Sequence, residues 1–260
     1  MSCVLRALSI NAVLHTGGGE VRPVLRQLTS QAPIITQIDG LLTPAECDAL
    51  VQRAEKAGFQ PSRTGGFRGE ERTSAHRTSR TSYLPEDDPV VACIGRRLAT
   101  VAAMPWGGLE PLQATRYTIG QQYQSHHDAP TGSRGRQRRL KTIFAYLQAD
   151  GGLAAGNCGG ATRFDRLRQQ NGKPLRVYPA VGRAVMWNNY DDGKRDPRTH
   201  HGGEMVTCPG VEKTGLNAWF HGAKPRQAAG KSRTPVWATK HTARKKRGSP
   251  RREMRSRSRK

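Results

Sequence analysis

Apolar residues recur every three or four positions in two stretches of the chain, the spacing that places them on one face of an α-helix. The first stretch follows Thr43, a suitable N-cap, and Pro44, a favourable first helical residue, and it stops at Gly58. Its apolar positions are Cys47, Leu50, Val51 and Ala54. The second stretch runs over residues 90–104, with Val91, Ile94, Leu98 and Val101 on one face. We therefore predict two amphipathic helices, at about 43–57 and 90–104.

Elsewhere the apolar pattern is that of strands. Alternating or buried-looking strand segments are expected at residues 34–38, 112–128, 142–147 and 177–188. Residues 61–82 lack periodicity and predict an exposed loop, while the glycine-rich residues 151–158 predict a connector. The order of elements predicts a β-barrel supported by two helices.

Two potential metal ligands stand at the end of the strand-like stretch that begins at Leu112. His126 and Asp128 are two residues apart, so their side chains project from the same face of a regular strand. Tyr117 lies at an odd offset from His126, which would place it on the opposite face. We therefore predict a turn or bulge at Gly120-Gln121 that lets Tyr117 and His126 face one cavity.

A third ligand must come from elsewhere in the chain, and the adjacent pair His200-His201 offers it. Two His and one carboxylate form the facial triad of non-haem Fe(II) oxygenases, which leaves positions open for a co-substrate and O2. Neighbours on a strand face opposite sides, so at most one of His200 and His201 binds the metal. Strand geometry alone leaves both open.

The order of these residues resembles the catalytic domain of the prolyl 4-hydroxylases over residues 35–222. The matching blocks are Tyr117-x-x-Gly-Gln-x-Tyr-x-x-His-x-Asp128, Gly159-Gly-x-Thr-x-Phe164 and Asp196-Pro-x-Thr-x-His-Gly-Gly203, followed by Lys213 and Trp219. Members of that family are Fe(II)- and 2-oxoglutarate-dependent dioxygenases. The resemblance implies an α+β fold, a double-stranded β-helix (jelly roll, cupin-like) with supporting N-terminal helices and a disordered basic C-terminal tail.

The resemblance also implies a role for each matched residue. The expected metal ligands are His126, Asp128 and His201, with His200 as the fallback. The side chains expected to bind 2-oxoglutarate are Tyr117, Thr162 and Lys213, the ammonium pairing with the distal carboxylate. The side chains expected to border the substrate are Tyr123 and Trp219.

Three departures from the family pattern accompany the match. The family has an acid at the position of Ala161 and a Cys-Pro where this chain has Glu204-Met205. Lys213 also stands two residues further from His201 than is usual in the family. We expect a longer turn at residues 208–210 to absorb that excess.

The implied activity is hydroxylation of a prolyl residue in an extended peptide, with Fe(II), 2-oxoglutarate, O2 and L-ascorbate as cofactors. Nucleic-acid oxidative demethylation is a rival that a basic tail would suit. Against it, those demethylases are known for Arg rather than Lys at the 2-oxoglutarate anchor. A second rival is a non-catalytic RNA-binding module, which the intact triad disfavours.

Composition divides the chain into three parts. At 260 residues, of which 35% are hydrophobic, it can bury one sizeable core. Residues 223–260, the basic tail, hold 15 Lys or Arg against Glu253, a net charge of +14, which leaves +9 of the total +23 for the rest. We expect a flexible leader at 1–33, a dioxygenase domain at 34–222 and a tail that can contact polyanions or nucleic acid.

Cysteine usage and the ends of the chain bear on the compartment. Five cysteines without CxxC spacing suggest neither a disulfide framework nor a zinc site, so we expect reduced thiols. No signal peptide or membrane span is recognisable, although arginines in the leader leave organelle transit open. A cytoplasmic or nuclear location is favoured, the latter by residues 244–247; the family resemblance allows the endoplasmic reticulum.

Overall fold

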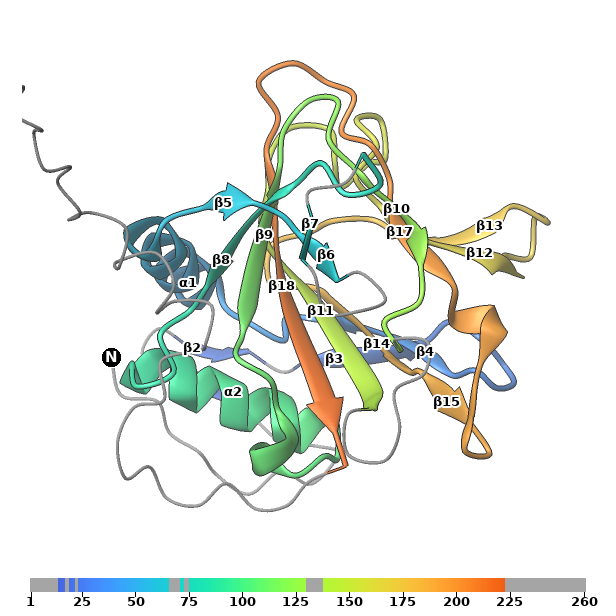
Figure 1. Cartoon of the computed structure of the whole chain (residues 1–260), viewed down its shortest axis with the longest axis horizontal. Helices are drawn as coiled ribbons and strands as arrows, with labels where there is room; N and C mark the ends of the chain where they lie inside the picture. Colours follow the sequence, from blue (N-terminus) through green and yellow to red (C-terminus); the bar gives the residue numbers. More distant parts are fainter. Residues whose placement is uncertain are drawn as a thin grey trace, which may run out of the picture. The chain divides into compact units, whose positions relative to one another are not determined.

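The computed structural model describes residues 14–16, 19–21, 23–65, 71–72, 75–129 and 138–222, all of which belong to a unit spanning Met1–Pro225. Two antiparallel sheets form its body (Figure 1). The predicted disordered tail lies outside the described residues, as does about half of the predicted flexible leader, and both stay predictions.

The large sheet has eight strands in the order β3-β4-β14-β11-β18-β9-β8-β5. The first four in this order are β3 (Val24–Gln27), β4 (Ile35–Asp39), β14 (Ala184–Asn188) and β11 (Arg139–Ala149). The others are β18 (Lys213–His221), β9 (Gln113–Tyr117), β8 (Arg80–Tyr83) and β5 (Gln60–Pro61). The centre of the sheet is the long pairing of β11 with β18, flanked by β14 and β9.

The small sheet has four strands in the order β10-β17-β12-β13. Its strands are β10 (Tyr123–His126), β17 (His201–Gly203), β12 (Thr162–Arg168) and β13 (Pro174–Val177). Side chains from both sheets line one cavity between them. Two sheets with this arrangement confirm the predicted double-stranded β-helix.

Three short hairpins and two 3-10 turns complete the described chain. The hairpins are β1 (Leu14–Thr16) with β2 (Gly19–Val21), β6 (Thr64–Gly65) with β7 (Glu71–Arg72), and β15 (Tyr190–Asp191) with β16 (Lys194–Arg195). The 3-10 turns are η1 (Trp106–Gly108) and η3 (Pro197–Thr199).

The first helix begins where its capping residues predict, and the second begins one residue before the predicted start at 90. In α1 (Pro44–Ala57), Thr43 and Glu46 form a capping box, and Gly58 with φ +88° ends the helix. In α2 (Pro89–Val101), the Asp88 side chain accepts from two backbone N–H groups, and the helix stops three residues before the predicted end at 104. Their apolar faces join the large sheet in one core, so the helices support the barrel (Figure 1).

Two sequence predictions about local structure were wrong. The stretch 61–82 is not simply an exposed loop, because Arg80–Tyr83 forms β8 in the large sheet, paired with β9. Asp128 does not lie on a strand, because β10 ends at His126 and a bend follows. The expected turn after Tyr117 is present, with Gly120 at φ +75°.

The expectation of reduced thiols was also wrong. Cys158 and Cys208 form a disulfide with their Cα atoms 5.1 Å apart, and Cys93 is disulfide-bonded as well. Cys47, a residue of α1, is free and buried. Neither helix of the described chain has the length and apolar character needed to cross a membrane.

Candidate active site

Three side chains that the sequence singled out as metal ligands meet at one point between the sheets. His126 ends β10 and His201 begins β17, and the two residues stand opposite each other in the pairing of these strands. Asp128 follows in the bend after β10, with Oδ1 3.4 Å from His126 Nε2 and Oδ2 3.8 Å from His201 Nε2. One ligand atom from each residue lies within 4.8 Å of the others.

Backbone carbonyls fix the orientation of both imidazoles. His126 Nδ1 donates to the carbonyl of Gln124, and His201 Nδ1 donates to the carbonyl of Thr199, both at 2.9 Å. A carbonyl only accepts, so Nδ1 carries the proton and Nε2 keeps its lone pair for a metal. The donor set of two imidazole nitrogens and one carboxylate therefore fits Fe(II).

The Asp-Pro-x-Thr-x-His block, residues 196–201, orients the ring of His201 through local hydrogen bonds. Asp196 caps the 3-10 turn η3 by accepting from Arg198 N, and Thr199 Oγ1 donates to the Asp196 carbonyl. This turn presents the Thr199 carbonyl to the ring of His201. The block thus aims one metal ligand.

Electrostatics favour the protonation state that a metal requires. Burial raises the pKa of Asp128, but His201, His126 and Arg139 outweigh it and hold the pKa well below its usual range. Burial lowers the pKa of His201 to about 4, against the opposing effect of Asp128. At neutral pH the site therefore holds an ionised carboxylate beside a neutral imidazole.

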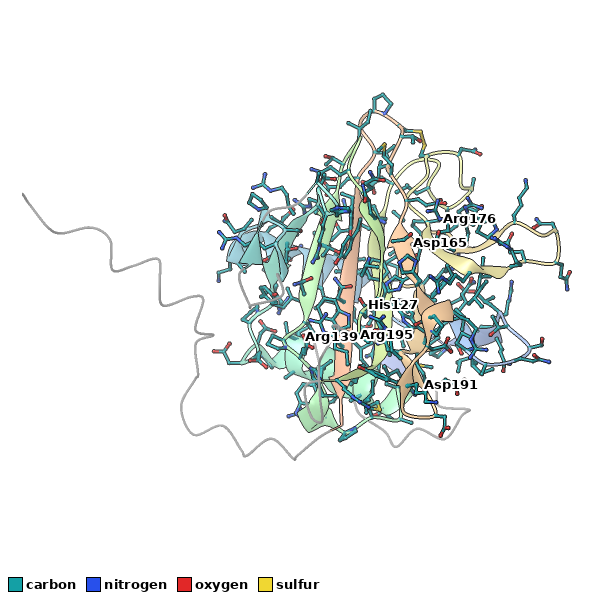
Figure 2. All side chains as sticks on the ribbon, turned by 45° about the vertical axis from the view of Figure 1, so that its right-hand side comes forward. His127, Arg139, Asp165, Arg176, Asp191 and Arg195 are labelled. Atoms are coloured by element: carbon teal, nitrogen blue, oxygen red, sulfur yellow. A yellow bond between two sulfur atoms is a disulfide. The ribbon has the colours of Figure 1, made fainter. Side chains whose placement is uncertain are left out.

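The neighbouring histidines lie away from this point. His200 Nδ1 is 3.3 Å from Asp165 Oδ2, and the ring of His127 packs against that of His200 at 4.9 Å between centroids. Burial and nearby Arg195 lower the pKa of His127 to about 4 (Figure 2). The structure brings His201, and not the fallback His200, to His126 and Asp128.

The expected 2-oxoglutarate end of the cavity is built on β18 and β9. Lys213 is 1% exposed; its Nζ donates to the carbonyl of Gly160 at 2.8 Å and lies 4.3 Å from the ring centroid of Tyr117, its partner in the strand pairing. Within the described residues no carboxylate lies within ion-pair distance of Lys213. Burial lowers the pKa of Lys213 to about 7. A buried ammonium without a counter-ion suits a dicarboxylate.

Thr162 lines the same cavity, but its hydroxyl hydrogen is already used in a hydrogen bond to Tyr146. Tyr146 Oη donates to the Val177 carbonyl at 2.8 Å, which uses its only hydrogen. The 2.7 Å contact between Tyr146 Oη and Thr162 Oγ1 is therefore donated by Thr162. The expected role of Thr162 as a donor to the co-substrate requires that this bond be released.

The expected substrate residues line the same cavity. Tyr123 stacks on His126 with ring centroids 3.6 Å apart, and the guanidinium of Arg77 lies 4.8 Å from the Tyr123 ring. Trp219 is covered by the guanidinium of Arg139 at 3.8 Å. Arg139 is held in place by Glu110, with which it makes two hydrogen bonds of 2.6 and 2.8 Å.

All eight side chains expected to form the site line this one cavity, together with residues that sequence reasoning missed. The missed side chains are Arg77, Phe144, Trp187 and Asn217. Asn217 could have been found, because it shares a strand face with Lys213 and Trp219. Arg77 gave no such signal, since it lies in the stretch assigned to a loop.

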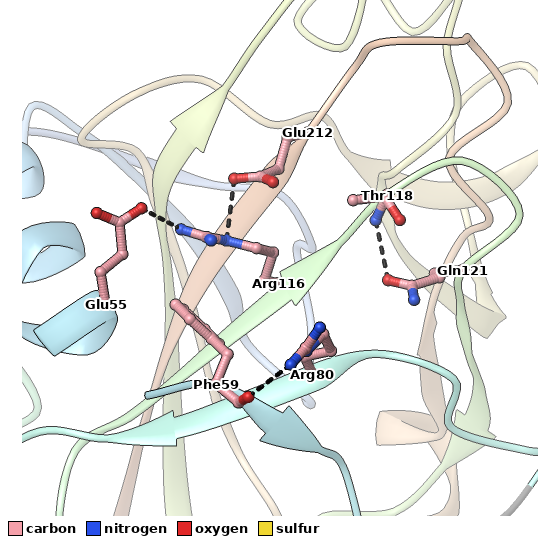
Figure 3. A pocket seen from close by; sticks show the side chains of 7 residues that line it. All are labelled: Glu55, Phe59, Arg80, Arg116, Thr118, Gln121 and Glu212. Atoms are coloured by element: carbon pink, nitrogen blue, oxygen red, sulfur yellow. Dashed lines mark hydrogen bonds and ion pairs between the residues drawn. The ribbon is translucent and has the colours of Figure 1, made fainter. Parts of the chain in front are cut away.

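A second, open pocket lies on the outer side of β9 and contains none of the expected site residues (Figure 3). Arg116, the neighbour of Tyr117, pairs there with Glu55 and Glu212, each at 2.9 Å, and stacks on Phe59. Its guanidinium is thus neutralised within the fold. The chemistry of the site belongs to the cavity between the sheets.

Comparison with known proteins agrees with this geometry. The sequence pattern of the 2OG-Fe(II) oxygenase superfamily matches residues 112–221. Prolyl 4-hydroxylase 1 of Arabidopsis thaliana is 31% identical over 78% of this chain and 72% of its own length. Prolyl 4-hydroxylase 5 of the same plant is 28% identical over 75% of this chain and 70% of its own length.

Solved structures agree at the level of the fold. The viral collagen prolyl hydroxylase from Paramecium Bursaria Chlorella virus-1, as its 2-oxoglutarate complex, superposes with a TM-score of 0.56 at 24% identity, covering 73% of this chain and 96% of that one. The matched pattern and the assembled ligands define a dioxygenase that depends on Fe(II) and 2-oxoglutarate. More narrowly, the chain belongs to the prolyl 4-hydroxylase family.

The lowered pKa of Lys213 predicts that co-substrate binding depends on pH. The free protein loses the Lys213 proton as pH rises through about 7, whereas a bound dicarboxylate requires the charged form. We expect the affinity for 2-oxoglutarate to fall by up to about tenfold per pH unit above that point. Calorimetric titration of the Ni(II)-loaded protein across neutral pH measures this. Lys213→Arg, which stays charged, should flatten the profile; a flat profile in the wild type would contradict the prediction.

Proposed function

We propose that this protein hydroxylates prolyl residues of a peptide or protein substrate. One observation carries the proposal: His126, Asp128 and His201 converge at one point, while Lys213 stands buried in the same cavity with no carboxylate of the described residues within ion-pair distance. Membership in the prolyl 4-hydroxylase family supplies the substrate class. A related solved structure is described as a prolyl hydroxylase with a peptide fragment of hypoxia inducible factor.

The metal ligands and the rest of the cavity would have different roles in the reaction. Fe(II) held by His126, Asp128 and His201 supplies, with O2 and 2-oxoglutarate, the oxidation that hydroxylates a C–H bond and yields succinate and CO2. Lys213 and Tyr117 hold the distal carboxylate of the diacid, and burial excludes water around them. L-Ascorbate would keep the metal reduced.

The substrate would lie across the open side of the metal ligands. Tyr123 and Trp219 would border it with aromatic edges, because guanidinium groups lie over the faces of both rings. Arg77 and Arg139 stand beside them, and Arg139 is tied to Glu110. Arg77 bonds to the neutral side chains of Ser79, Thr81 and Gln113. An extended peptide could accept hydrogen bonds from these guanidinium groups through its backbone carbonyls.

Succinate release in the presence of Fe(II), 2-oxoglutarate and proline-rich peptides tests the proposal. His126→Ala should reduce turnover by more than about a hundredfold, because changing groups that merely orient a ligand already costs about 10- to 100-fold. His127→Ala is the matched control, since its ring faces away from the ligands, and it should retain activity. Stimulation by methylated oligonucleotides alone would replace the prolyl assignment with nucleic-acid demethylation. Full activity of His126→Ala would remove the metal assignment.

We further propose that the basic tail, residues 223–260, contacts polyanions such as RNA. Its net charge of +14 supports this. The logarithm of the association constant for single-stranded RNA should fall linearly with the logarithm of the salt concentration. Replacing Arg244, Lys245, Lys246 and Arg247 by Gln should reduce that slope by about 3 if each contacts a phosphate. Salt-independent binding would contradict a polyanion role.

An oxidising compartment is our proposal for where the chain works. The disulfide between Cys158 and Cys208 supports it, because such bonds persist outside the reducing cytosol and nucleus. This differs from the location favoured by the sequence. Alkylating free thiols in freshly broken cells before purification tests it: Cys158 and Cys208 should escape labelling, whereas labelling of both would favour a reducing compartment.

A further inference from the structure

A chain of four buried side chains ends on the carboxylate of Asp128. Trp187 Nε1 donates to Asn189 Oδ1 at 2.9 Å, Asn189 Nδ2 donates to Thr142 Oγ1 at 2.9 Å, and Thr142 Oγ1 donates to Asp128 Oδ2 at 2.8 Å. Trp187 is 2% exposed, Asn189 1% and Thr142 0%. None of the first three would bind the metal directly.

The chemistry of the groups fixes the direction of every bond in this chain. The indole N–H of Trp187 can only donate, so the atom of Asn189 that faces it must be the oxygen. The Asn189 amide therefore points its NH2 group at Thr142 and at the carbonyl of Arg139, 3.1 Å away. With a donor already aimed at its oxygen, the Thr142 hydroxyl has its single hydrogen left for Asp128.

The rest of the large sheet holds these groups in register. Thr142 and Trp187 stand opposite each other where β11 pairs with β14. The backbone N–H of Asn189 donates to the Leu140 carbonyl at 2.8 Å, just beyond the end of β14. The Trp187 ring also packs on His201, with centroids 4.6 Å apart. One tryptophan thus touches one metal ligand and reaches another through hydrogen bonds.

We propose that Trp187, Asn189 and Thr142 are positioning residues that make Asp128 a one-oxygen metal ligand. Thr142 donates a charge-assisted hydrogen bond to Oδ2, the oxygen that also lies 3.8 Å from His201 Nε2, so Oδ1, 3.4 Å from His126 Nε2, is the oxygen more available to a metal. Binding through a single oxygen keeps the remaining positions open for the diacid and O2. This inference rests on the proposed function, because it takes His126, Asp128 and His201 as the ligands.

Titration of the full-length protein with Co(II), followed by its visible absorption, tests the role of the Thr142 hydroxyl. Thr142→Val keeps the shape and removes the donor, and should raise the Co(II) dissociation constant by about 10- to 100-fold. Thr142→Ser restores the donor and should stay within about threefold of wild type. Thr214→Val is the matched control: Thr214 is another fully buried threonine, whose hydroxyl bonds to Gln148 rather than to a ligand.

A double-mutant cycle tests whether Asn189 acts through Thr142. Asn189→Asp replaces the donor with a second acceptor, so the Thr142 hydrogen should turn away from Asp128 and Co(II) affinity should fall. In the Thr142→Val background the same change should raise the Co(II) dissociation constant by less than about a further threefold, because the hydrogen bond from Thr142 to Asp128 is already absent.

The outcomes separate this inference from the proposed function. Folded Thr142→Val protein with wild-type Co(II) affinity and an unchanged Co(II) spectrum would overturn the positioning role and leave the metal site intact. Additive losses of Co(II) affinity in the double mutant would show that Asn189 does not act through Thr142. Wild-type protein that binds no Co(II) would overturn both the inference and the proposed function.

Discussion

The site depends on the pairing of two short strands, β10 and β17. This pairing sets His126 opposite His201, two residues far apart in the chain, and so places both Nε2 atoms beside Asp128. The two imidazoles are then oriented by carbonyls two residues before each ring. The register of the two strands thus sets the distance between the metal ligands, and the local backbone sets the orientation of their rings.

Sequence patterns predicted most of this arrangement because the relevant signals are local. Capping residues marked the start of the first helix, and the odd offset of Tyr117 from His126 demanded the turn that Gly120 makes. Alignment with a known family, rather than periodicity, singled out His201 over its neighbour His200. The choice agrees with the geometry, in which His200 faces Asp165 instead.

What the sequence could not show depends on contacts between distant segments. The stretch before Tyr83 lacks apolar alternation, yet it forms β8 because β9 offers a free edge. Cys158 and Cys208 have no spacing that signals a bond; the fold places their Cα atoms 5.1 Å apart. The commitment of the Thr162 hydroxyl likewise depends on Tyr146 and Val177, which a linear motif does not contain.

The disulfide also closes a loop around the end of the cavity that receives the diacid. Cys158 lies two residues before Gly160, whose carbonyl accepts from Lys213, and Cys208 lies five residues before Lys213 itself. Both walls are therefore tethered before any ligand arrives. Without the disulfide, the two segments would lose conformational entropy when 2-oxoglutarate binds, and this loss would weaken the affinity. The oxidation state of two sulfur atoms therefore helps to set how rigid the receptor for 2-oxoglutarate is.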